Sequence, residues 1–164
     1  MLERTHDPSR VLALSDGVFA IVITLLVLEV HVPELSQGQS LTGALAEVRP
    51  SFNAFVITFI LTGMYWVAHR DLFTLIRRID RGLVWLNILY LLPLCLLPFG
   101  AGMLGRYEQE PVALSAFSVI VYLVAEVAPG ASLLIYAAMP VLYILSVTVL
   151  RSSRKRDQEY ADFT

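Results

Sequence analysis

The feature that most constrains this chain is a long apolar stretch bounded by Asp7 and Pro33 near its start. Asp7 can cap a helix N-terminus, and Pro8 suits the first helical position, where a backbone N–H would have no partner. Pro33 predicts the end of the helix. A helix of about 25 residues is roughly 37 Å long, which exceeds the roughly 30 Å hydrocarbon core of a bilayer. The sequence therefore predicts a membrane-spanning first helix.

This first helix carries residues that a simple membrane anchor does not need. Asp16 lies inside the apolar stretch, and a carboxylate within a membrane is costly enough to indicate a function. Ile21, Leu25 and Leu28 recur at i, i+4 and i+7, which places them on one stripe of the helix. Periodicity alone favours packing of this stripe inside one bundle. Thr24 lies beside it, and its simplest role is a hydroxyl that bonds to its own helix.

Composition places the whole chain among polytopic membrane proteins. Hydrophobic residues make up 57% of the 164 residues, charged residues make up 16%, and the mean hydropathy is +0.68. These values are too apolar for a soluble globular protein. We therefore predict one all-α transmembrane bundle over residues 1–164 with five candidate membrane helices. After the first helix, the apolar runs cover residues 52–68, 83–104, 112–127 and 131–150.

The segments around these runs carry further signals. Residues 34–50 are polar and are predicted to form a loop. Pro93 and Pro98 lie within the third run and are expected to kink it. The tail, residues 151–164, is basic and then acidic. Its basic part favours attraction to anionic lipid over binding of nucleic acid.

The distribution of arginines predicts the orientation in the membrane. Arg70, Arg77, Arg78 and Arg81 lie close together after the second run. Under the positive-inside rule this connection is cytoplasmic, and so is the N-terminus. Five crossings would then place the basic tail outside, against the same rule. The side of the C-terminus stays open.

The residues that catalysis or metal binding would need are scattered. His6, His31 and His69 are far apart in the sequence, and Cys95 is the single cysteine. The chain also contains no HExxH motif, no CxxC motif and no glycine-rich phosphate loop. We predict a protein that is not an enzyme and that has no cofactor and no resident metal site.

Residues 10–28 form the pattern Arg10-x-x-x-Leu14-Ser15-Asp16-x-x-Phe19-Ala20-Ile21-x-x-Thr24-Leu25-Leu26-x-Leu28. This pattern resembles the first-helix signature of the transmembrane protein 175 family, whose members are potassium channels of animal endolysosomes and of prokaryotes. The family has a phenylalanine where this chain has Leu14. A family Trp-x-x-His motif matches Trp66 and His69, and a later Asp and Leu-Asn match Asp80 and Leu86-Asn87.

The resemblance implies a role for the apolar stripe. In the family the first helix lines the pore, and the residue that matches Ile21 forms its narrowest point. We expect Ile21, Leu25 and Leu28 to form a hydrophobic constriction, which can close a pore by dewetting. The position that matches Thr24 influences potassium preference. The resemblance thus predicts a potassium-permeable channel.

A channel of this kind needs several copies of the chain, because one copy of the helix cannot enclose a pore. Single-repeat members of the family assemble as tetramers, so the resemblance implies a homotetramer in the lipid bilayer. It also implies a multi-pass protein of a prokaryotic plasma membrane, with potassium as the permeant ion. The family has six helices per repeat, one more than the five runs found in this chain.

Asp16 lies about 140° around the helix from Ile21 and should face its own bundle. A charge buried there needs partners. His69 is a candidate for a pH-sensitive member of such a set. Alternatively, Trp66 belongs to an interfacial aromatic belt, and His69 is solvated among lipid headgroups. The predicted polar network comprises Arg10, Ser15, Asp16, Trp66, His69 and Asn87.

Two other functions fit the same residues. A proton-coupled transporter of a small molecule or ion would use a membrane carboxylate, either Asp16 or Glu29, as its proton site. A non-conducting membrane scaffold would need neither carboxylate. Passive potassium flux separates the channel from both alternatives.

Overall fold

A computed structural model describes residues 8–76 and 78–126, and the regular structure in these ranges is helical. The predicted all-α class is confirmed. Asp7, the predicted run over residues 131–150 and the tail over residues 151–164 lie outside the described residues. The helices are α1 (Pro8–Leu25), the short 3₁₀ helix η1 (Leu26–Glu29), α2 (Leu41–Glu47), α3 (Arg49–Thr74), α4 (Arg81–Cys95), α5 (Leu97–Arg106) and α6 (Pro111–Glu126).

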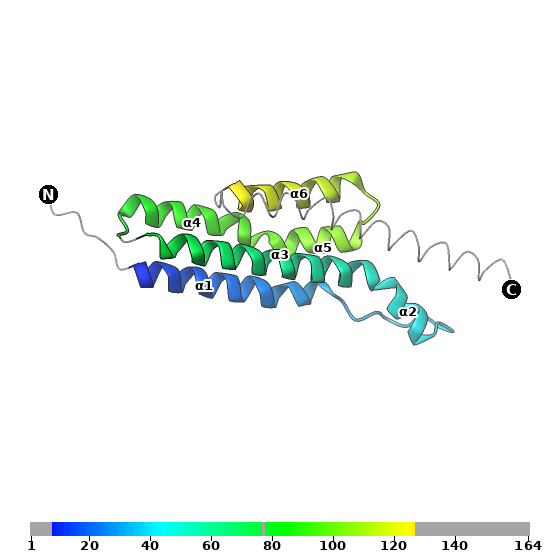
Figure 1. Ribbon diagram of the computed structural model, residues 1–164. Coiled ribbons are helices and arrows are strands. Elements are labelled where there is room, and N and C mark those ends of the chain that lie inside the picture. The colour runs from blue at the N-terminus through cyan, green and yellow to red at the C-terminus, as the bar shows by residue number, and fades with distance from the viewer. Residues whose placement is uncertain (1–7, 77, 127–164) are drawn as a thin grey trace.

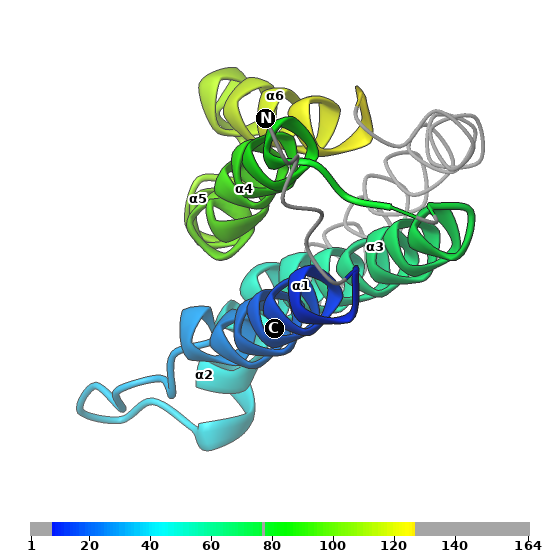
Figure 2. The same cartoon turned by 90° about the vertical axis from the view of Figure 1, so that its left-hand side faces the viewer.

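The long helices pack side by side (Figure 1). α1 lies along one edge of the bundle next to α3, α4 contacts α1, and α5 contacts α3. α6 packs on α4 and α5 at the opposite edge from α1 (Figure 2). Among the described residues, one long side of α1 is therefore left without a neighbouring helix.

Three segments of the described chain are long and apolar enough to cross a membrane. They are Ser9–Glu29, Arg49–Thr74 and Arg81–Arg106, and the last comprises α4 and α5 together. The helix over Pro111–Ala125 is apolar but shorter. The first four predicted runs therefore correspond to helices.

The third run is interrupted where the prolines predict it. α4 ends at Cys95 and α5 begins at Leu97, with Pro93 inside the first helix and Pro98 in the first turn of the second. Each proline removes one backbone donor from the helical ladder. Leu96 bridges the break, because its N–H donates to the Pro93 carbonyl at 3.1 Å and its carbonyl accepts from Gly100 at 3.0 Å.

Two local predictions need correction. The polar segment after α1 is not all loop, since α2 lies within it. Ser40 starts that helix by accepting a 3.1 Å hydrogen bond from the Gly43 N–H. The first helix is also not α-helical to its end, because it tightens into η1 after Leu25. Such 3₁₀ turns are frequent at helix termini, and Pro33 three residues beyond Val30 prevents any continuation.

The core joins α1, α3, α4, α5 and α6 in one cluster of buried side chains. Phe19 and Val22 of α1 belong to it, together with Leu61 and Tyr65 of α3. Close approach of α5 is possible because it has glycines at its contacts. A Cβ on Gly105 would lie 2.7 Å from the Ser51 Cα of α3, so these two backbones pass each other in near contact.

The two ends of the bundle differ in charge. We call the end where α1 begins the arginine-rich end and the end where α1 stops the acidic end. The arginine-rich end has four described arginines, Arg10, Arg70, Arg78 and Arg81, against three aspartates, Asp16, Asp71 and Asp80. The acidic end has five glutamates, Glu29, Glu34, Glu47, Glu108 and Glu110, against two arginines, Arg49 and Arg106.

Candidate functional site

The predicted apolar stripe of α1 is exposed in the single chain. Ile21 is 59% exposed, Leu25 is 43% exposed and Leu28 is 66% exposed. Within the described residues, the stripe therefore does not pack against its own bundle, in contrast to the packing that periodicity alone favoured. The opposite face of α1 is buried through Phe19, Val22 and Leu26 instead.

Thr24 lies next to this stripe and is also exposed. Its Oγ1 donates a 2.8 Å hydrogen bond to the Ile21 carbonyl, as expected for a threonine that bonds to its own helix. The hydroxyl oxygen keeps its acceptor lone pairs, because the bond uses only the proton. Thr24 thus presents its hydroxyl oxygen on the exposed face of α1.

Three residues of the predicted network meet in the core. The Asn87 Nδ2 donates to Ser15 Oγ at 3.0 Å, and Ser15 Oγ donates to the Val11 carbonyl at 3.1 Å. The His69 Nε2 lies 2.9 Å from Asn87 Oδ1. A consistent set of donors and acceptors places the His69 proton on Nε2, since Asn87 Oδ1 can only accept. α1, α3 and α4 are joined at this point.

His69 is deeply buried, with 4% of its surface exposed. Its ring stacks on Phe73 with 4.6 Å between centroids and on Tyr90 with 5.2 Å between centroids. A position among solvated lipid headgroups is therefore excluded for this residue. Within the described residues, His69 Nδ1 and the Tyr90 hydroxyl are buried without a hydrogen-bond partner.

Asp16 forms a second link between α1 and α3. The Trp66 indole N–H donates to Asp16 Oδ1 at 2.8 Å, and both side chains are partly buried. The Trp66 ring also contacts Arg70, whose guanidinium carbon lies 5.8 Å from the ring centroid. The carboxylate thus faces its own subunit, as the helix geometry predicted.

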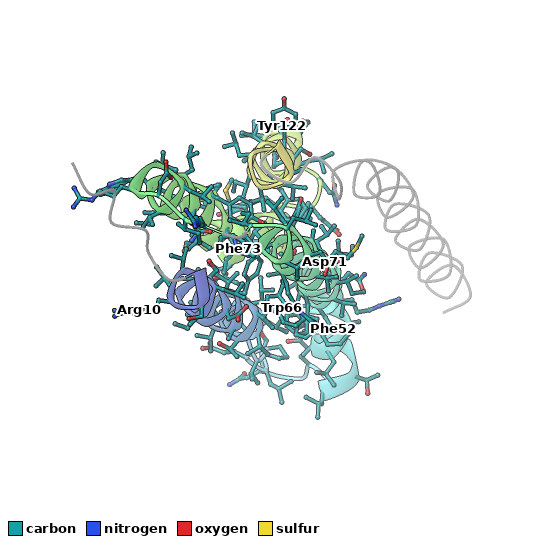
Figure 3. All side chains as sticks on the ribbon, turned by 60° about the vertical axis from the view of Figure 1, so that its left-hand side comes forward. Arg10, Phe52, Trp66, Asp71, Phe73 and Tyr122 are labelled. Atoms are coloured by element: carbon teal, nitrogen blue, oxygen red, sulfur yellow. The ribbon has the colours of Figure 1, made fainter. Side chains whose placement is uncertain are left out.

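The structure does not join Arg10 to these contacts. Its side chain is exposed and extends away from the helices (Figure 3). Within residues 8–76 and 78–126 it has no hydrogen bond or ion pair. Asp80, which the resemblance also matched, caps α4 by accepting a 2.8 Å hydrogen bond from the Leu83 N–H.

The far end of α1 makes contacts that the sequence did not predict. The Glu29 carboxylate lies against Gly102 of α5, in space that a Cβ at position 102 would fill. The His31 Nδ1 donates to the Glu29 carbonyl at 3.1 Å, and Arg106 Nη2 donates to His31 Nε2 at 3.1 Å. Gly102 and Arg106 are one turn apart on α5, and this i, i+4 spacing was the only sequence signal that both residues lie on the same side of α5.

The two faces of α1 differ in their surroundings. One face is held to its subunit by hydrogen bonds, and the other is apolar, exposed and continuous over Ile21, Leu25 and Leu28. In the described part of the chain, no three His, Cys, Asp or Glu side chains gather where they could hold a metal ion.

Comparisons with known proteins agree with this arrangement. A potassium channel of Streptomyces collinus is 38% identical over 124 residues, which are 73% of this chain and 60% of that protein. The human endosomal/lysosomal proton channel TMEM175 is 35% identical over 117 residues, 65% of this chain and 23% of that protein. The chain thus spans at most about 60% of these relatives.

A solved structure and a family model complete the comparison. The crystal structure of a lysosomal potassium-selective channel TMEM175 homologue from Chamaesiphon minutus matches with a TM-score of 0.71 and 32% identity, over 86% of this chain and 78% of that one. The model of the family described as endosomal/lysosomal potassium channel TMEM175 matches residues 10–98. This match and the apolar helices make the chain a membrane protein, and it belongs to the TMEM175 family.

Proposed function

We propose that this chain is a subunit of a potassium-permeable cation channel and that α1 of each copy lines the ion path. The observation that carries the proposal is the exposed stripe of Ile21, Leu25 and Leu28 on a helix whose other face is bonded to its own subunit. The bacterial relative named as a potassium channel and the potassium-selective structural relative support the same ion.

A ring of identical copies would turn the exposed stripes toward a common axis. Four copies are proposed because the first helix resembles that of tetrameric single-repeat members. At the axis, Ile21 side chains would form the narrowest ring, where alkyl groups cannot replace the hydration shell of a cation. Thr24 would offer an oxygen to a partly dehydrated ion. Ion passage would need no cofactor and no catalytic step.

Protons are a second candidate ion, because the human relative is named a proton channel. A coupled transporter differs from both channels in its energetics, since it moves one solute only with another. Glu29 is its better proton site, because its carboxylate is half-buried and has no hydrogen-bond partner in the described ranges. Asp16 already accepts the Trp66 N–H.

The proposal is tested with purified protein in liposomes under an outward potassium gradient. We expect passive, electrogenic potassium flux without a proton gradient, and empty liposomes are the baseline. Asp16→Asn keeps an oxygen for the Trp66 N–H, so the folded variant should still conduct. Flux that requires a proton gradient and stops in Asp16→Asn or Glu29→Gln would establish a transporter instead.

We also propose the orientation and the membrane. The excess of arginine at the end where α1 begins supports a cytoplasmic N-terminus in a prokaryotic plasma membrane. Thr74 is exposed at this end. In a Cys95→Ser background, Thr74→Cys should react with an impermeant thiol reagent only after the cells are opened. Labelling from outside intact cells would reverse the orientation.

A further inference from the structure

The short helix α2 has an apolar side that is exposed. Leu41 and Leu45 are one turn apart, so they lie on the same side of the helix. Leu41 is 58% exposed and Leu45 is 52% exposed. Glu47 lies about 120–160° around the helix from these two leucines. The helix is therefore amphipathic, with two large apolar side chains on one side and a carboxylate on another.

Other residues of α2 hold it in place. Ala44 is fully buried, and α2 contacts α3. Glu47 Oε1 accepts a 2.9 Å hydrogen bond from Gln39 Nε2, in the segment that precedes the helix. Ser40 caps the helix N-terminus. These contacts fix the helix against the bundle and leave the two leucines outside them.

The length of α3 gives the level of α2 in the membrane. α3 has 26 residues, which makes it about 39 Å long, more than the roughly 30 Å hydrocarbon core but less than the roughly 40–45 Å that includes the headgroups. With α3 centred in the bilayer, its first residue, Arg49, lies among the headgroups. α2 ends at Glu47, directly before α3, at the acidic end of the bundle (Figure 1). α2 is therefore placed at headgroup level.

An amphipathic helix at this level buries its apolar side at the boundary between headgroups and acyl chains. We propose that Leu41 and Leu45 form a lipid-docking surface that attaches α2 to this boundary at the acidic end of the bundle. The driving force is the removal of two leucine side chains from water. This surface does not depend on the proposed channel function.

The charges near this surface indicate which lipids it accepts. α2 contains no Lys or Arg, and its single charged residue is Glu47. Arg49, at the start of α3, carries the opposite charge. Attraction between basic side chains and anionic lipid is therefore not available to α2 itself. Docking should use the acyl-chain region, so a zwitterionic lipid such as phosphatidylcholine is sufficient.

The test uses the full-length protein in phosphatidylcholine liposomes, with one cysteine introduced into a Cys95→Ser background. A fluorophore on Leu41→Cys or on Leu45→Cys should be quenched by lipid brominated near the top of the acyl chain. Quenching by iodide, present on both sides of the membrane, should be several-fold weaker there than at Ala46→Cys. Ala46 is the matched control, because it is exposed and lies about 100–140° around the helix from the leucines.

Three outcomes would overturn the lipid-docking surface. Iodide quenching at positions 41 and 45 as strong as at position 46 would show that the leucines face water. Protection from both quenchers would indicate a protein neighbour, such as a second copy of the chain. Quenching by brominated lipid only when phosphatidylglycerol is added would make an anionic headgroup the ligand. The two leucine positions are labelled separately, and size-exclusion profiles identify a variant that fails to fold, so either position alone can decide.

Discussion

The two halves of the first membrane segment, which comprises α1 and η1, are attached to the bundle by different interactions. In the first half, Ser15 and Asp16 make hydrogen bonds to Asn87 and Trp66 on two other helices. In the second half, Val22 and Leu26 are buried by apolar packing, and the helix tightens into η1. Its last contacts are those of Glu29 and His31 with α5.

This difference indicates that the two halves constrain the helix in different ways. Hydrogen bonds depend on distance and angle, so the first half fixes the rotation of α1 about its axis. Apolar burial is non-directional, so the packing of Val22 and Leu26 constrains the rotation of the helix less than the hydrogen bonds do. The exposed stripe of Ile21, Leu25 and Leu28 belongs to this second half. We infer that the first half determines which side chains face outward in the second.

The strongest test of this contrast is Asn87→Leu, which removes the amide shared by Ser15 and His69. The His69 Nε2–H is left without a partner and Ser15 Oγ loses the bond that it accepts, which together should cost about 2–4 kcal/mol. The midpoint of thermal unfolding in detergent measures the loss. Leu86→Ala, at the exposed neighbouring position, is the control and should have little effect. Equal midpoints for the two variants would show that the network adds no stability.

Trp66→Phe tests the second bond of the first half. The variant keeps an aromatic ring but loses the N–H that donates to Asp16, and a hydrogen bond to a charged group contributes about 1.5–3 kcal/mol. Asp16→Asn retains an acceptor and should cost less. Thermal unfolding of both variants is the measurement. A larger loss in Asp16→Asn would mean that the carboxylate has a partner besides Trp66.

In the second half, Ile21→Asn and Ile23→Asn distinguish the two sides of the helix. Ile21 is exposed and Ile23 is partly buried, so the Ile23 variant should lose about 1–3 kcal/mol for a buried amide without a partner. Ile21→Asn should leave the subunit folded, raise cation flux and weaken selectivity, because a polar constriction stays wet. Flux assays and size-exclusion profiles give the comparison. The reverse pattern would place the ion path on the other side.

The smallest expected effect concerns the end of α1. Gly102→Ala introduces a methyl group where the Glu29 carboxylate lies. The side chain can move away, so the expected cost is about 0.5–1 kcal/mol, the lower range of couplings between contacting residues. Glu29→Ala combined with Gly102→Ala should remove this cost in thermal unfolding. If the double variant unfolds at the same temperature as Gly102→Ala, the contact with Glu29 is not the cause of the lost stability.

The sequence was most informative where residue spacing is local. The helical period placed Ile21 and Asp16 on different sides of α1. The prolines at positions 93 and 98 predicted the break between α4 and α5.

Helix geometry placed Asp16 toward its own bundle, and the resemblance added Trp66, His69 and Asn87. In the structure, Ser15, His69 and Asn87 form one group of hydrogen bonds, and Asp16 and Trp66 form another. Arg10 stays outside because it lies on the exposed side of α1.

The remaining contacts could not be predicted because they join residues far apart in the chain. Glu29 meets Gly102, and His31 meets Arg106, only because α5 returns to the end of α1. The helix α2 was missed because it is short and lies in an otherwise polar segment, although Ser40 was a local signal for its start. The contact of Arg70 with Trp66 could have been found from the spacing alone.

The glycines of α5 determine where this protein can tolerate mutation. Any side chain at Gly105 would meet the backbone of Ser51, which cannot rotate away as a side chain can. At Gly100 a Cβ would lie 3.1 Å from Ile120 and 3.2 Å from Phe117, so α6 would have to yield slightly. α5 contains none of the residues proposed to face the ion. Sequence variation should nevertheless be restricted at Gly100, Gly102 and Gly105, because the space for a side chain there is already occupied by neighbouring residues.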